Sequence, residues 1–193
     1  MNFLSHLYLS GESEGLLLGN FIADSVKGRM IENFSPEVQA GIILHRKIDT
    51  FTDQHIIVEE SKKRLRPKYR KYAGVIVDIY YDHFLARNWE HYSSQSLSDY
   101  SKSIYTLVER NKVILPLRSS QFADYMIRYN ILNAYAELHG IERVLKGMAR
   151  RASFVSNMEH SIHDLKEHYD LFEIEFREFF PELRQFVNEQ IEI

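Results

Sequence analysis

The feature that most constrains the fold of this chain is the helical spacing of its apolar residues. Few helix-breaking residues interrupt this spacing. Four prolines and eight glycines occur among the 193 residues, and no Asn-Gly hairpin dipeptide is present. Apolar residues recur with helical spacing, as in the stripe of Val38, Ile42, Ile43 and Ile48. The run Gly74-Val-Ile-Val could pass for a buried strand, but its length favours a helix. Because no hairpin signal accompanies it, the pattern predicts one all-α domain over residues 1–193, built as a helical bundle.

Local signals predict where several helices begin and end. Ser35-Pro36-Glu37 is typical of a helix start, since serine caps, proline suits the first helical position and an acid occupies the first turn. Ser96 and Asp99 resemble a capping box with a shorter acid. Pro67 is expected to open a long helix, and Gly140 is expected to end one.

The last long segment, residues 161–180, carries charged residues on one face and aromatic residues on the other. Pro181 is expected to end this helix or to restart it. An amphipathic helix of this kind covers a core or contacts another copy of the chain, so a homo-oligomer through the C-terminal helix is one expectation.

Composition narrows the classes of protein that this chain can be. A hydrophobic content of 45% is sufficient for a core. The lack of cysteine excludes disulfide scaffolds, zinc-thiolate sites, iron–sulfur clusters and thiol nucleophiles, and it fits a cytoplasmic protein. No signal peptide is visible, and no apolar run is long enough to span a bilayer. A net charge of −3 gives no overall attraction to nucleic acid, so neither nucleic acid nor a membrane is an expected partner.

Basic residues are concentrated in one short stretch of this mildly acidic chain. Seven of ten consecutive residues are basic: Lys62, Lys63, Arg64, Arg66, Lys68, Arg70 and Lys71. A basic surface patch of this density would attract an acidic partner. The alternative is a solvated junction between two helices, because basic surface runs are common.

Polar groups that can carry chemistry lie in apolar surroundings at four places along the chain. They are His6, Asn20 with Asp24, His45 with Asp49, and Asp78 with Asp82 and the adjacent His83. The paired residues are four apart, so each pair shares one face of a helix. Burying a carboxylate without a partner costs on the order of several kcal/mol, so each of these carboxylates needs an ion-pair partner, a helix end to cap or a bound cation.

Helical bundles build metal sites from inward-facing carboxylates and imidazoles on adjacent helices. This chemistry predicts a divalent metal site built from several of these groups. Oxygen and nitrogen ligands without sulfur favour Mg²⁺ or Mn²⁺ over structural zinc. The ordinary structural alternatives are an ion pair of Asp24 with Lys27 or Arg46, a satisfied core histidine at His45, and a solvated stripe of Asp78 and Asp82 bridged to Arg70 or Lys71.

Several motifs together resemble a known family, the acyl carrier protein phosphodiesterases of bacteria. They are Met1-Asn-Phe-Leu-Ser-His-Leu, Leu18-Gly-Asn-Phe-Ile-Ala-Asp24, Gly41-Ile-Ile-Leu-His-Arg-Lys-Ile-Asp49, Thr52-Asp53-x-His55 and Asp78-Ile-Tyr-Tyr-Asp-His-Phe-Leu-Ala86. The resemblance implies an all-helical, divergent relative of the HD-type metal phosphohydrolases that uses Mn²⁺ or Mg²⁺. It also implies hydrolysis of the phosphodiester that joins 4′-phosphopantetheine to a serine of the carrier protein.

A mechanistic hypothesis then assigns roles to these residues. One or two metal ions would be held by Asp24, His45, Asp78 and Asp82. Asp49 or His83 would orient or deprotonate the attacking water, His83 or His6 would protonate the leaving serine oxygen, and Arg46 or Arg150 would hold non-bridging oxygens. Acyl carrier proteins are strongly acidic, so the stretch 62–71 is expected to steer their docking.

Two alternative functions fit the same residues. One is a metal phosphohydrolase that acts on a nucleotide or another small phosphodiester, which would share the ligands without needing the basic stretch. The other is a non-catalytic helical protein that binds an acidic partner; it predicts that Asp24→Ala and His45→Ala leave function intact.

Overall fold

Helices make up all the regular secondary structure of residues 1–191, the part of the chain that this computed structural model describes. The α-helices are α1 (Phe3–Leu9), α2 (Glu14–Ile22), α3 (Pro36–Gln54), α4 (Ile56–Tyr69), α5 (Ala73–Arg87), α6 (Leu97–Arg110), α7 (Leu117–Arg128), α8 (Ile131–Ala134), α9 (Leu138–Arg151), α10 (Ile162–Glu167) and α11 (Tyr169–Ile191). Because no strand occurs within residues 1–191, the prediction of an all-α fold is confirmed.

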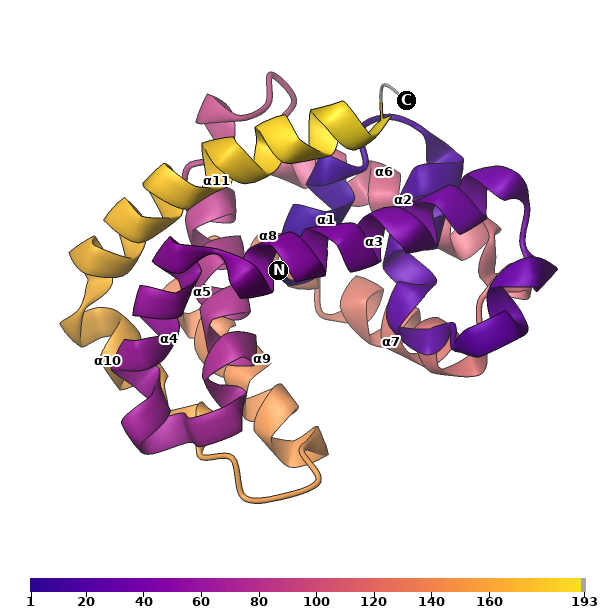
Figure 1. The fold of residues 1–193 in the computed structure, drawn as a ribbon. Helices are drawn as coiled ribbons and strands as arrows, with labels where there is room; N and C mark the ends of the chain where they lie inside the picture. The colour runs from indigo at the N-terminus through magenta and orange to yellow at the C-terminus, as the bar shows by residue number, and fades with distance from the viewer. Residues whose placement is uncertain (192–193) are drawn as a thin grey trace.

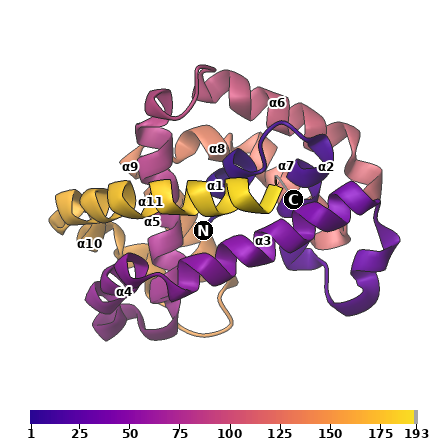
Figure 2. The same ribbon diagram turned by 45° about the horizontal axis from the view of Figure 1, so that its top comes forward.

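Helix α5 contacts α1, α4, α9 and α11, which lie around it (Figure 1). Ile76, Tyr80 and Phe84 are fully buried on it, and so are residues on its other faces. A helix that is apolar on all sides belongs in the interior of a bundle. The last helix, α11, crosses α5 (Figure 2). Phe172 and the aromatic residues that follow it on α11 belong to the same core.

Two glycines bring α2 and α3 into direct backbone contact. A Cβ atom added at Gly19 would overlap the carbonyl oxygen of Val38, and one added at Gly41 would overlap that of Leu16. Only glycine permits this approach, because any side chain would push the two helix axes apart. The close approach matters for the site, because it brings Asn20 of α2 within reach of α3.

Two of the predicted helix starts are confirmed. Helix α3 begins at Pro36 after Ser35, as the local sequence predicts. Ser96 Oγ accepts a hydrogen bond from Asp99 N (3.1 Å) and donates one to Asp99 Oδ2 (2.8 Å), so the capping box forms.

Three boundaries predicted from proline or glycine are wrong. Pro67 lies in the last turn of α4, and the break comes at Arg70, whose φ of 50° is left-handed. Gly140 lies inside α9, where a Cβ would overlap the backbone of Ala134. Pro181 lies inside α11. Buried residues lie on both sides of Pro67 and of Pro181, and this packing outweighs the local preference of proline.

The chain forms one continuous hydrophobic core from Met1 to Val187. No helix within residues 1–191 combines the length and the apolar character needed to cross a bilayer. The amino terminus lies in the middle of the molecule beside α3, rather than at its edge (Figure 1).

Candidate active site

The amino group of Met1 is buried between carboxylates of α3 and α5. Its nitrogen lies 3.2 Å from Asp78 Oδ1 and 3.5 Å from Asp49 Oδ1. Burial disfavours the charged amine, but Asp78 and Asp49 outweigh this and hold the pKa of the Met1 amine above its ordinary value. The start of the chain therefore ties α3 to α5 at one point.

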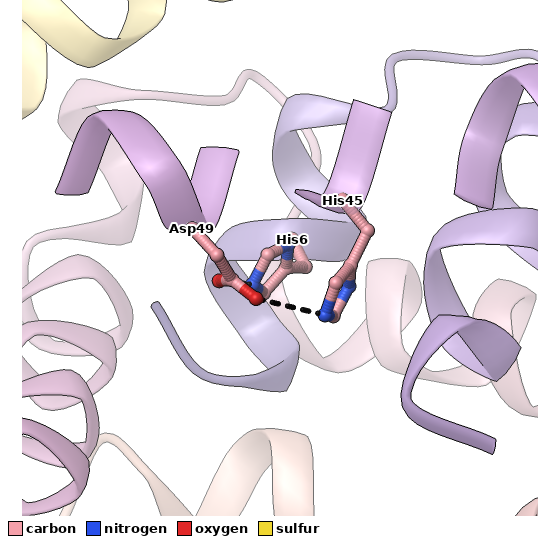
Figure 3. A group of neighbouring side chains, drawn as sticks. All are labelled: His6, His45 and Asp49. Atoms are coloured by element: carbon pink, nitrogen blue, oxygen red, sulfur yellow. Dashed lines mark hydrogen bonds and ion pairs between the residues drawn. The ribbon is translucent and has the colours of Figure 1, made fainter. Parts of the chain in front are cut away.

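His6, His45 and Asp49 converge on one point (Figure 3), and Asp49 is also one of the carboxylates that contact the Met1 amine. His45 Nε2 is 3.2 Å from Asp49 Oδ2, and His6 Nε2 is 3.0 Å from Asp49 Oδ1. The two imidazole rings stack with their centroids 3.9 Å apart and 14° between their planes. One potential ligand atom from each residue lies within 4.8 Å of the others, so the three side chains present nitrogen and oxygen donors to one point.

A buried hydrogen-bond network fixes the tautomer of His45. Asn20 Nδ2 donates to the His6 carbonyl oxygen (3.0 Å) and to Ser10 Oγ (2.8 Å), whose own hydroxyl donates to the His6 carbonyl (2.9 Å). Because the amide nitrogen is thus occupied, Asn20 Oδ1 must accept from His45 Nδ1–H, at 2.8 Å. The other nitrogen of His45, Nε2, is directed toward Asp49 and Asp24.

The two histidines have opposite pKa shifts. Burial lowers the pKa of His6 to about 4, and the charge of His45 adds to this effect. Burial also acts against a charged His45, but hydrogen bonds to Asp24 and Asp49 outweigh it and raise the pKa of His45 to about 9. Burial opposes ionisation of Asp49, yet its bonds to both imidazoles hold the pKa of that carboxyl well below its usual range. A cation bound here would displace the proton at His45 Nε2.

The cluster opens into a pocket with a volume of about 270 Å³. Asp24 lies at one side, mostly exposed, with Oδ1 3.5 Å from His45 Nε2. Asp78 lies at another side, and burial raises its pKa. The structure therefore brings five of the predicted site residues to one pocket: His6, Asp24, His45, Asp49 and Asp78.

Asp82, a predicted metal ligand, lies beneath α1 and not in this pocket. It is fully buried. Its Oδ2 accepts from Leu4 N (2.7 Å), and its Oδ1 accepts from Ser5 N (3.1 Å) and from the Ser5 hydroxyl. These donors are the free amides of the first turn of α1, so the structure corrects the role of Asp82 to that of a helix cap.

The structure also places two predicted catalytic residues away from the pocket. Both nitrogens of His83 are occupied, since Nδ1 donates to the Tyr135 carbonyl (2.7 Å) and Nε2 accepts from the Tyr169 hydroxyl (2.8 Å). Arg46 donates to the Val26 carbonyl (3.1 Å). His83 thus joins α5 to neighbouring elements, and Arg46 braces the segment that follows Asp24.

Most charges of the predicted basic patch are paired within the chain. The pairs are Lys62 with Asp53, Lys63 with Glu60, Arg64 with Glu175, Arg66 with Glu59, and Lys68 with Asp164. Within residues 1–191, Arg70 and Lys71 are the members without a carboxylate partner. The stretch is therefore closer to the alternative interpretation, a solvated junction between helices, than to an open basic patch.

The sequence contains no signal for Met1 or Ser10 as site residues, and it indicated Asn20 only as a polar group paired with Asp24. A polar residue inside the apolar segment 16–23 was a signal for Asn20, but nothing local shows that it meets His45 of another helix. The amine of Met1 carries no side-chain signal, because every chain has an amino group at its start.

The donor set fits a divalent cation. Imidazole nitrogens and a carboxylate converge, Asp24 adds a carboxylate nearby, and Asn20 orients His45 from behind as outer-shell partners of metal ligands do. No thiolate ligand is available, since the chain has no cysteine.

Comparison with known proteins gives the chain a family. Residues 1–183 match the family described as acyl carrier protein phosphodiesterase. Proteins named acyl carrier protein phosphodiesterase from Yersinia enterocolitica and Escherichia coli are 36% and 37% identical to it, over 94% and 96% of both chains respectively. A third, from Photorhabdus laumondii, is 36% identical over 94% of this chain and 92% of its own. No solved structure matches the chain significantly. The chain therefore belongs to the acyl carrier protein phosphodiesterase family.

Proposed function

We propose that this protein hydrolyses the phosphodiester that joins 4′-phosphopantetheine to a serine of holo-acyl carrier protein. The products are the apo carrier protein and 4′-phosphopantetheine. One observation carries the proposal: His6, His45 and Asp49 converge at an open pocket in a chain whose relatives, matched over nearly their full length, are named for this activity.

We propose that the reaction uses a divalent cation held by His6, His45, Asp49 and Asp24. When bound, such a cation lowers the pKa of a water molecule and neutralises phosphate charge in the transition state. Of the two cations expected from the sequence, Mn²⁺ suits this set better than Mg²⁺, because Mg²⁺ prefers oxygen ligands and is lower in the general affinity order.

Asp78 is our candidate for the proton acceptor. It lies at the pocket on α5, opposite the donor set of α3, and burial raises its pKa above that of an ordinary carboxyl. A carboxylate with a raised pKa is a better base. In the proposed reaction Asp78 takes a proton from the attacking water while the water oxygen bonds to phosphorus. The phosphorus–serine oxygen bond breaks, and the serine oxygen takes a proton from solvent.

The ion pairs of the stretch 62–71 change where we place carrier protein docking. Basic residues without a carboxylate partner within residues 1–191 include Arg70, Lys71, Arg118 and Arg151. Arg118 and Arg151 line a cleft beside the pocket. We propose that these four charges, and not the paired ones, steer the acidic carrier protein.

Three further expectations from the sequence are also part of the proposal: the fold relationship, the oligomeric state and the location in the cell. His45 and Asp49, one turn apart at the pocket, support a relationship to the HD-type metal phosphohydrolases. The exposed side chains of Leu171 and Ile174 on α11 support a homo-oligomer through that helix. The proposed substrate, a carrier protein of fatty acid synthesis, supports a cytoplasmic location.

The proposal is tested by mass spectrometry of the carrier protein. The purified enzyme is incubated with holo-acyl carrier protein and Mn²⁺, with and without a chelator. The parent enzyme and a control, His139→Ala at an exposed position of α9, should remove the mass of phosphopantetheine only when metal is present. His45→Ala should remove none while keeping its helical circular dichroism. An uncleaved carrier protein with the parent enzyme and Mn²⁺ would sink the proposal.

The neutralised basic stretch favours one second candidate, a metal phosphohydrolase that acts on a nucleotide or small phosphodiester. Such an enzyme needs the pocket but no surface for an acidic protein. Equal kcat/KM on bis(4-nitrophenyl) phosphate and on holo-acyl carrier protein would support this candidate over the first.

A further inference from the structure

A second cavity, larger than the site pocket, opens beside it between α7 and the end of α9. This cleft has a volume of about 540 Å³. Aromatic rings from three elements meet at its walls: Phe3 stacks on Phe122 with centroids 4.1 Å apart, and Phe21 lies 6.1 Å from Phe122. Small-molecule sites have volumes of about 300–1,000 Å³, whereas a protein partner covers about 800 Å² of open surface. The cleft is therefore sized for a small group.

The cleft is continuous with the site pocket. Phe3, Asp24, Val75 and Met148 line both cavities. Phe3 is also only three residues before His6 on α1. A molecule whose reacting phosphate lies at the donor set can therefore extend into the cleft without leaving the protein surface.

The polar groups of the cleft suit an uncharged chain with amide groups. Ser119 Oγ donates to Ser25 Oγ at 2.7 Å, and Gln121 adds an amide at the exposed edge. Among the described residues that line the cleft, Asp24 is the one carboxylate, and it lies at the end shared with the pocket. The rest of the lining is mainly apolar, apart from two arginines on its edge.

We propose that the cleft binds the pantetheine arm of the carrier protein while its phosphodiester lies in the site pocket. This inference rests on the proposed function. The arm is neutral, begins with a branched aliphatic segment next to the phosphate, and continues through two amides to a thiol. The branched segment packs against Phe3 and Met148 at the shared end, and the amides face Ser25, Ser119 and Gln121. The arm stays in the cleft when the serine leaves, so the product departs last.

The test fills the cleft from its edge. Gln121 is exposed, so Gln121→Trp adds a large side chain to the cleft without disturbing the core. Arg128→Trp is the matched control, because it adds the same side chain to α7 at an exposed position outside the cleft. Each variant is assayed for KM with holo-acyl carrier protein, and its binding of free pantetheine is measured by calorimetry.

The parent and the control should bind pantetheine and show the same KM. Gln121→Trp should raise KM and weaken pantetheine binding by about tenfold or more, with an unchanged melting temperature. A parent enzyme that leaves holo carrier protein intact defeats the proposed function. A parent that cleaves it, together with a Gln121→Trp variant whose KM and pantetheine binding match the parent, overturns only the assignment of the cleft.

Discussion

Replacement of Asp82 by alanine distinguishes between two roles for this carboxylate, that of a metal ligand and that of a cap of α1. An α-helix leaves the amides of its first turn without partners inside the helix. In α1 the Phe3 amide is taken by Asn2 Oδ1 (3.0 Å), while those of Leu4 and Ser5 are taken by Asp82. Alanine at position 82 leaves both of the latter amides buried and unpaired.

The expected loss of stability follows from these contacts. Each buried, unsatisfied amide costs about 1–3 kcal/mol, so the two together lower the free energy of unfolding by about 2–6 kcal/mol. Domains of this size have a total stability of about 5–15 kcal/mol, so the loss is large enough to measure. Affinity for Mn²⁺ should fall as well, because His6 lies on the helix that loses its cap.

The measurement is urea unfolding, followed by circular dichroism, with a chelator present throughout. Asp99→Ala is the control, since Asp99 is an exposed carboxylate in the first turn of α6 and its loss should cost about 1 kcal/mol or less. The cap requires Asp82→Ala to be strongly destabilised without metal. An apo stability equal to that of the parent, combined with a large loss of Mn²⁺ affinity, would restore the ligand role and refute the reasoning.

The same carboxyl gives stability a specific pH dependence. Burial raises the pKa of Asp82 from 3.8 to about 7, against the hydrogen bonds from Ser5 and Leu4. Between those two values the folded protein holds a proton that the unfolded chain has released. The contribution of Asp82 to the free energy of unfolding therefore falls as pH rises from about 4 to about 7. The difference in unfolding free energy between parent and Asp82→Ala should shrink across this window; a constant difference would contradict the shift.

Three further predictions follow from contacts described above. Asn20→Leu removes the acceptor that fixes the His45 tautomer and should weaken Mn²⁺ binding about 10–100-fold by calorimetry, whereas unchanged affinity would remove its orienting role. Gly19→Ala forces α2 away from α3 and should lower the free energy of unfolding by about 1–3 kcal/mol or more in urea, and a neutral result would mean that the helices separate freely. The double variant Lys63→Gln, Arg66→Gln should leave KM for holo carrier protein and its salt dependence unchanged, while Lys71→Gln raises KM at low salt; the reverse result would return docking to the paired charges.

The helical fold was predictable because its signals are local. The capping box of Ser96 and Asp99 forms between neighbours in the chain, whatever the remaining helices do. Predictions that depended on one proline or glycine failed where tertiary contacts decide. Around Pro181 the side chains of Phe179, Phe180 and Leu183 are fully buried, and this packing keeps α11 helical on both sides.

The candidate site was predictable only within single helices. His45 and Asp49 are one turn apart on α3, so their spacing was enough to predict that their side chains meet, as they do at 3.2 Å between Nε2 and Oδ2. The contact of His45 with Asn20 depends on the close approach of α2 and α3 at their glycines. The contact of His45 with His6 depends on the position of α1 in the bundle. Spacing along the chain carries no information about these distances.

Asp78 and Asp82 show the physical limit of such spacing most clearly. Both lie on one face of α5, four residues apart, like His45 and Asp49 on α3. One turn of helix is about 5.4 Å, which here is enough to move a carboxylate from the pocket to the interior. Asp78 meets the amino group of Met1 at the pocket, whereas Asp82 meets the amides of Leu4 and Ser5 beneath it. The first residues of the chain thus lie along this face of α5 and satisfy both carboxylates, leaving only Asp78 with access to a substrate.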